Sequence, residues 1–303
     1  MRRIPFLKYQ LFFGLVSIVV VLASVLLVAT KGLNFDTDFT GGRKLLFQFS
    51  ESVNETDIRQ ALDRAGITDA TVRLYGEAGE DRFTIKAGIL SEDQGDETDP
   101  IMTAMITAFG ADQVTLQQED SVGPKAGKEL RRKAQVAILV SCLLILIYIG
   151  FRFDFMFAPG AIVALIHDII ITLGAISLTG QNFSLTSVAA LLTILGYSIN
   201  DTIVLYDRVR EDAAASGQDV DADLVTTAIN QVFSRTIITS VTVLFVVVVL
   251  YFIAEGAIRD FAFAMIVGVI AGTYSSIFVA SPVYLLMRRI WPKISPLISG
   301  SKA

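Results

Sequence analysis

An aspartate, Asp201, lies in the middle of an apolar run that is long enough to cross a membrane. The run extends from Leu185 to Tyr206, and Asn200 directly precedes the aspartate. An ionised Asp near the centre of a bilayer costs about 2.5–3.5 kcal/mol on insertion scales, so a chain keeps it there when the carboxylate has a partner or a function. Intramembrane carboxylates are typical of proton and ion relays, and Asp201 is therefore the first candidate for chemistry.

Two further charged residues lie in or beside other apolar runs. Asp168 follows His167 inside the run 157–178, and Arg235 precedes the run that begins at Ile237. Desolvation favours the neutral form of a carboxyl group, whereas a nearby guanidinium favours the ionised form. An aspartate beside a movable arginine can thus change its protonation state with a small change in helix packing. We therefore predict a proton-transfer set that consists of Asp201, Arg235, Asp168 and Asn200.

Each of these residues also has a purely structural interpretation. His167 and Asp168 could form a buried hydrogen-bonded pair that only supports packing, and Arg235 could be an anchor whose head group reaches the membrane surface. Helical spacing places Asp168 and Asp201 on stripes of small and polar residues, and it aligns Gly268 with Gly272 in the last run. Such stripes let helices approach closely. We expect both aspartates and Arg235 in the interior of a helix bundle, and a packing role for the two glycines.

The composition is that of an integral membrane protein. The chain has 303 residues, is 53% hydrophobic and 18% charged, and has a mean hydropathy of +0.59. Acidic residues gather between Glu51 and Glu119, and no basic patch interleaved with aromatic residues indicates nucleic acid. With one cysteine, Cys142, and one histidine, this chain alone cannot form a disulfide or a His/Cys metal site. We expect no cofactor and no metal.

Six apolar runs have the length of about 20 residues that a hydrocarbon core of about 30 Å requires. The first run follows Arg2, Arg3 and Lys8 and is too long for the apolar part of a usual signal peptide. We therefore interpret it as an uncleaved anchor. The six predicted transmembrane helices cover 10–29, 134–150, 157–178, 185–206, 237–254 and 261–287.

The distribution of Lys and Arg predicts the orientation of the chain. With six spans, Arg2, Arg152, Arg208 and Arg288 all fall on one side, which we interpret as the cytoplasm. The cluster at 131–133 would lie on the other side, but long translocated segments largely escape this rule. We expect a cytoplasmic N-terminus with the first helix at 1–30, a periplasmic domain at 31–133, a five-helix bundle at 134–287 and a cytoplasmic tail at 288–303.

The segment 31–133 has the pattern of a small α+β domain. Its predicted order is βαββαβ, which indicates a ferredoxin-like sheet with helices on one face. No paired catalytic carboxylates, Ser/His pair or phosphate-cradling glycine loop is found in the segment, so we expect a binding or mechanical module and no enzyme. The predicted strands are 43–50, 70–75, 82–87 and 113–118, and the predicted helices are 54–65 and 100–109.

Four short motifs follow one another around the apolar runs. They are Asp38-Phe39-Thr40-Gly41-Gly42, Ser121-Val122-Gly123-Pro124 with Gly127, the stretch 196–208 around Asp201, and Ser234-Arg235-Thr236. Each motif alone is modest, but the four in this order around six runs are highly specific. Together they resemble the SecF family of bacterial protein-export subunits, over nearly the whole chain from about Phe35 to Val283.

The resemblance implies properties that the spacing of residues does not. It implies half of a transporter of the resistance-nodulation-division type in the bacterial inner membrane, paired with SecD and associated with the SecYEG channel and its accessory subunits. Such a complex uses the proton-motive force to move a translocating preprotein, and the family's proton route falls on Asp201 and Arg235. Two alternatives are a proton-coupled small-molecule exporter of the same superfamily and a passive scaffold that only docks partners.

Overall fold

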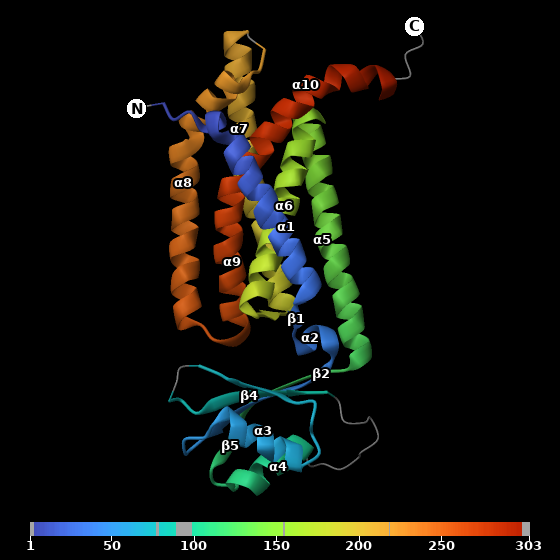
Figure 1. Ribbon diagram of the computed structural model, residues 1–303, viewed down its shortest axis with the longest axis vertical. Helices are drawn as coiled ribbons and strands as arrows, with labels where there is room; N and C mark the ends of the chain where they lie inside the picture. Colours follow the sequence, from blue (N-terminus) through green and yellow to red (C-terminus); the bar gives the residue numbers. More distant parts are fainter. Residues whose placement is uncertain (1–2, 77–78, 89–98, 154, 218, 299–303) are drawn as a thin grey trace. The chain divides into compact units, whose positions relative to one another are not determined.

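The computed structural model describes residues 3–76, 79–88, 99–153, 155–217 and 219–298, and it divides into two compact units (Figure 1). The first, which we call the helical unit, comprises Met1–Asn34, Val136–Ile253 and Ile258–Ala303. The second, the α/β unit, comprises Phe35–Gln135 with Ala254–Ala257. Each unit has its own cluster of buried apolar side chains, and each is described here by itself.

The α/β unit is built on a four-stranded antiparallel sheet. The strands pair in the order β3-β4-β2-β5, and the chain order β2-α3-β3-β4-α4-β5 confirms the predicted ferredoxin-like arrangement. The last strand ends four residues later than the sequence indicates. The elements are α2 (Thr37–Thr40), β2 (Gly42–Phe49), α3 (Glu55–Arg64), β3 (Thr71–Leu74), β4 (Arg82–Ala87), α4 (Pro100–Phe109) and β5 (Val114–Val122).

Local chemistry explains where α4 of this unit begins and ends. Pro100 occupies the first turn of α4, where a missing N–H costs nothing, and the Asp99 side chain accepts a hydrogen bond from the Ile101 backbone N–H at 2.9 Å. Gly110, at a φ of 93°, ends the helix. The core between the helices and the sheet is formed by Leu45, Phe47, Ile58, Leu62, Ile85 and Met105, with their neighbours.

The helical unit contains the predicted membrane spans. Within the described residues, six helices are long enough and apolar enough to cross a membrane, which confirms the predicted number. The last of them runs through a π-helical turn. The elements are α1 (Gln10–Thr30, after the 3-10 turn Phe6–Tyr9), α5 (Pro124–Arg152, which begins in the α/β unit), α6 (Ala158–Thr179), α7 (Leu185–Ser216), α8 (Ala222–Ile253), α9 (Gly256–Ser275), the π-helix η3 (Ser276–Ala280) and α10 (Ser281–Ile298).

Several of these helices extend well beyond the apolar runs. The sequence places the end of the fourth span at Tyr206, but α7 continues to Ser216 before Gly217 ends it at a φ of 64°. The extension is amphipathic and carries ion pairs one turn apart, such as Arg208–Asp212 at 2.9 Å. Such pairs support a helix in water, so hydropathy marks the apolar span and not the whole helix.

Helices α6, α7 and α9 form the interior of the helical unit, whereas α1, α5 and α8 expose most of their large apolar side chains. Small residues allow the interior helices to approach. A Cβ on Gly272 would lie 2.9 Å from the Ser198 Cβ, and a Cβ on Gly268 would overlap the Ile194 side chain. The predicted packing role of Gly268 and Gly272 is therefore confirmed, and it brings α9 against the polar stretch of α7.

Candidate functional site

Asp168 is fully buried in α6, and side chains from three helices surround its carboxylate. Its Oδ1 lies 2.9 Å from Nδ1 of His167 on the same helix. Its Oδ2 accepts a hydrogen bond from the Ser198 hydroxyl of α7 at 2.6 Å and another from the Ser275 hydroxyl of α9 at 2.9 Å. Both carboxylate oxygens thus have partners, which compensates for much of the cost of burying the group.

The local structure of three helices positions this cluster. The close approach of α9 to α7 at Gly272 places Ser275, one turn further along α9, within reach of Asp168. The Thr172 hydroxyl donates to the backbone oxygen of Asp168 at 2.8 Å and keeps its own polar group inside the helix. The cluster therefore ties α6, α7 and α9 together, and the sequence stripes had indicated only that Asp168 is buried.

Asp201 of α7 is also buried, with 4% of its surface exposed, but its surroundings are different. Among the described residues, its Oδ2 has no hydrogen-bond partner. The hydroxyl of Tyr197, one turn earlier on the same helix, is also buried and has no hydrogen-bond partner among the described residues. An unsatisfied buried carboxylate costs free energy, so Asp201 is an expensive residue that this chain alone does not compensate.

The prediction that Arg235 of α8 lies in the bundle interior is wrong. Its side chain is exposed. Helices α7 and α8 pack together, but none of the ion pairs within 4.0 Å found among the described residues joins Arg235 to Asp201. The spacing of polar residues indicates that they share one side of a helix, but it does not indicate whether that side is buried or exposed in the fold.

The exposed polar residues of α7 and α8 include Thr193, Asn200 and Arg235, which we call the open polar face. All three are exposed, although each lies in a helix that can cross a membrane. Polar and charged side chains inside membrane spans usually face a protein interior or a water-filled cavity and not lipid. The open polar face therefore differs from the exposed apolar surfaces of the other helices.

The two glycine-rich motifs of the α/β unit contact each other. Gly41 has a φ of 73°, and a Cβ there would lie 2.8 Å from Cα of Pro124. A Cβ on Gly42, which has a φ of 130°, would lie 2.6 Å from the Ala87 oxygen. The Gly123 oxygen accepts the Gly127 N–H at 3.0 Å. Asp38 lies half-buried beside them in α2. The glycines of these motifs permit a backbone contact where α5 begins.

The sequence reasoning missed Asp36, whose carboxylate pairs with two lysines. Lys44 of β2 and Lys86 of β4 lie directly opposite each other in the sheet, and like charges in that position repel. The Asp36 carboxylate lies 2.8 Å from Nζ of Lys86 and 3.5 Å from Nζ of Lys44, with 4% of the residue exposed. Only the strand register reveals this triad, and a single sequence contains no direct signal for the register.

Charges decide the titration of this triad. Burial alone would raise the pKa of Asp36, but Lys86, Lys44 and the Thr37 N–H outweigh it and hold the pKa below its usual value. Burial lowers the pKa of Lys86, and the attraction of Asp36 only partly opposes this. No group of three or more His, Cys, Asp or Glu side chains within the described residues is arranged to hold a metal ion.

Comparisons with known proteins point in one direction. The family described as protein export membrane protein SecD/SecF, C-terminal, matches residues 101–290. The protein translocase subunit SecF of Desulfurispirillum indicum is 40% identical over 301 residues, which cover 97% of this chain and 95% of the relative. The SecF subunit of Vibrio alginolyticus is 41% identical over 286 residues, or 94% of this chain and 90% of that one.

Longer relatives contain a similar region as one part of a larger chain. The protein translocase subunit SecDF of Thermus thermophilus is 39% identical over 263 residues, which are 84% of this chain but 34% of the relative. A crystal structure of SecDF from Thermus, described as a translocon-associated membrane protein, matches with a TM-score of 0.84 and 36% identity. The match covers 95% of this chain and 39% of the solved one.

Proposed function

Because the chain belongs to the SecD/SecF family of protein export membrane proteins, we propose that it is a SecF-type subunit of the Sec preprotein translocase that uses the proton-motive force. In this proposal it works with a SecD-type partner and promotes late steps of translocation across the inner membrane. Asp201 takes up and releases the proton, Arg235 balances its charge, and Asn200 and Asp168 complete the polar environment.

The observation that carries this proposal is the unsatisfied carboxylate of Asp201. It is buried in a helix that can cross a membrane, and its Oδ2 has no hydrogen-bond partner among the described residues. An ionisable residue in such a position is by default a functional one. A carboxylate that lacks fixed donors can gain or lose a proton with little structural cost, and this is what a relay requires.

The open polar face supports a SecD-type partner. Asn200 and Arg235 would face hydrocarbon if α7 and α8 were left uncovered, whereas a second set of spans would enclose them with Asp201. Relatives that carry SecD and SecF in one chain are long enough to contain a second set of spans, because the match to this chain covers 34% of the length of one of them. The proposal extends to the SecYEG channel and the translocating preprotein, which the relatives' role in translocation implies.

The proton-motive force is strong enough to drive a conformational change in this arrangement. An elementary charge that crosses 100 mV releases about 2.3 kcal/mol, and conformations that differ by a few kcal/mol respond to such a bias. The α/β unit is joined to the helical unit after α1 and through α5. A shift of these helices could therefore move the α/β unit, which we place on the periplasmic side, with both termini in the cytoplasm.

Asp201→Asn tests the proposal, with Asp207→Asn as its matched control on the same helix. Asp207 is half-buried and forms ion pairs with Arg210 at 3.0 Å and with Arg152 of α5 at 3.3 Å, so its loss affects these partly exposed pairs and not the carboxylate of Asp201. Both variants are co-reconstituted with the SecD-type partner in liposomes, and export is followed in cells. We expect Asp201→Asn to abolish proton flux and slow export, and Asp207→Asn to retain both.

Other outcomes would favour other functions. If flux and export both survive Asp201→Asn with normal assembly, the proton-relay proposal fails and the protein is a passive scaffold. If the variant loses resistance to toxic compounds while export is unaffected, the small-molecule exporter is favoured. We give that exporter less weight because the relatives are named translocase subunits.

A further inference from the structure

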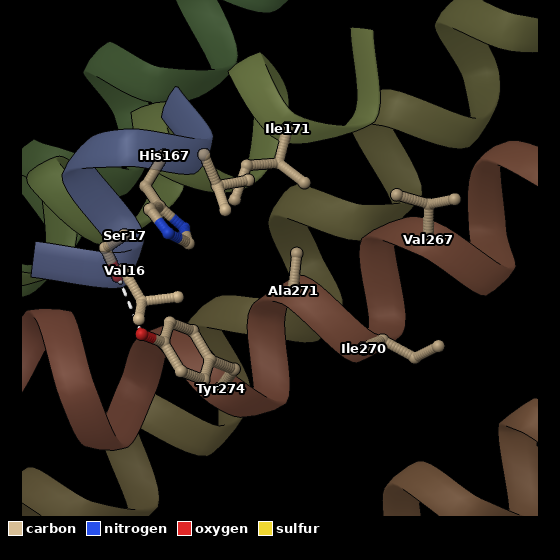
Figure 2. A pocket seen from close by; sticks show the side chains of 9 residues that line it. Val16, Ser17, His167, Ile171, Val267, Ile270, Ala271 and Tyr274 are labelled. Carbon is tan, nitrogen blue, oxygen red and sulfur yellow. Dashed lines mark hydrogen bonds between the residues drawn. The ribbon is translucent and has the colours of Figure 1, made fainter. Parts of the chain in front are cut away.

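An apolar pocket lies in the helical unit between α1, α6 and α9 (Figure 2). Its volume is about 320 Å³, near the lower end of the range of about 300–1,000 Å³ that is usual for ligand pockets. Every lining residue lies in a helix that can cross a membrane. The lining consists of Val16, Ser17, Val20, His167, Ile171, Val267, Ile270, Ala271 and Tyr274.

The mouth of the pocket is continuous with the lipid-facing surface of these helices. Val16 and Val20 of α1 and Ile270 of α9 are exposed, the last with 55% of its surface. No acidic residue, lysine or arginine lines the pocket. Bulky aliphatic side chains without polar neighbours are suited to lipid, whereas small and polar residues predominate where membrane helices contact protein. This surface therefore differs from the open polar face, which we assign to the protein partner.

The inner wall carries three polar side chains: the hydroxyls of Ser17 and Tyr274 have hydrogen-bond partners, whereas Nε2 of His167 is buried and has none among the described residues. The Ser17 and Tyr274 hydroxyls lie 2.9 Å apart (Figure 2). The Tyr274 hydroxyl donates to the Phe13 backbone oxygen at 2.6 Å. The rings of His167 and Tyr274 stack with their centroids 5.9 Å apart. Water in a protein cavity needs two to four polar partners, and apolar cavities stay dry or bind apolar molecules.

We propose that this pocket is a seat for one hydrocarbon chain of a membrane lipid. The apolar lining, the volume and a mouth that opens to lipid all suit an acyl chain. Bound there, the chain contacts the face of the pocket formed by His167, which pairs with Asp168. The lipid chain would thus keep water from reaching the Asp168 cluster from the pocket. Water could then still reach the cluster from the protein interior.

Photo-crosslinking tests this site on the full chain, purified with its SecD-type partner in nanodiscs of phosphatidylethanolamine and phosphatidylglycerol. A small fraction of the phospholipid carries a diazirine near the end of one acyl chain, and mass spectrometry locates the labelled residues. We expect labelling on α9 at Val267 and Ala271, residues that line the pocket. Ala271→Trp, which fills the pocket, should abolish this labelling.

Two further variants separate a specific seat from general lipid contact. Val20→Trp narrows the mouth from α1 and should also remove the pocket labelling, which guards against misfolding of Ala271→Trp. Leu144→Trp, at an exposed position of α5, is the control and should leave it unchanged. The proposal is overturned if the pocket residues are labelled no more than the exposed face of α5, if the Trp variants fold but change nothing, or if the pocket residues crosslink to the partner protein instead.

Discussion

Asp168 and Asp201 are both buried aspartates of the helical unit, yet their surroundings are opposite. Asp168 has partners for both oxygens from three helices, whereas Asp201 has a buried oxygen without one. The first arrangement links three helices, whereas the second is the one to which the proposed function assigns proton exchange. If that proposal holds, hydrogen-bond satisfaction, and not burial, distinguishes an anchoring carboxylate from one that is suited to a relay.

The largest stability effect should come from removing the satisfied carboxylate. Asp168→Ala leaves His167, Ser198 and Ser275 without their common acceptor, and we expect a loss of about 3 kcal/mol in the free energy of unfolding. Denaturation in mixed micelles measures it. A loss below about 1 kcal/mol would show that the cluster does not hold the helices together and would remove the difference between the two aspartates.

A third buried carboxylate, Asp36, extends the comparison to a charge-paired site outside the membrane spans. Asp36→Asn leaves Lys86 partly buried opposite Lys44, and we expect a loss of about 2 kcal/mol. Because the folded-state pKa of Asp36 is lowered, its contribution is complete above the unfolded pKa of about 4 and disappears as the pH falls through the lower folded value.

Hydrogen exchange of the β2 and β4 amides in the full chain checks this prediction. Protection in the unchanged protein should fall below about pH 4, after correction for the intrinsic exchange rates. In Asp36→Asn, amide protection should already be lower at neutral pH. It should not show the further fall on acidification that the unchanged protein shows. Equal acid dependence in both proteins would mean that other carboxylates, and not Asp36, control the stability of this sheet.

A smaller effect should follow from removing one donor of the Asp168 cluster. Ser275→Ala removes one hydroxyl and leaves Ser198 and His167 in place, so we expect a loss of about 1 kcal/mol. Ser216→Ala is a control at an exposed hydroxyl of α7 and should have a smaller effect. If Ser275→Ala also abolishes proton flux at nearly unchanged stability, the cluster belongs to the proton route, as the sequence analysis predicted for Asp168.

The smallest stability effect should come from Asp201 itself. Asp201→Ala removes a carboxylate that the chain does not satisfy, so we expect the free energy of unfolding to change by less than about 1 kcal/mol, or to rise. The same denaturation assay measures it, on the chain without its partner. A loss as large as that of Asp168→Ala would contradict the comparison, because Asp201 would then have partners of equal strength.

Much of the local structure could be predicted from periodicity. Continuous apolar runs indicated six spans, and alternating and helical patterns in 31–133 indicated the βαββαβ order, which the structure confirms. Helix ends were predicted less well, because the polar extension of α7 is stabilised by ion pairs that hydropathy does not register. The burial of Asp168 and Asp201 followed from the stripes of small and polar residues on which helical spacing places them.

The sequence by itself determined which segments cross the membrane, which residues are costly there and which family the motifs resemble. Each of these depends on residues that are close along the chain. Only the tertiary structure decided that Asp168 accepts hydrogen bonds from Ser198 and Ser275 and that the Arg235 side chain is exposed. It also decided that Asp36 forms ion pairs with two lysines that lie opposite each other in the sheet. These contacts depend on how distant helices and strands are placed against one another, and the period of a single helix or strand contains no information about its neighbours.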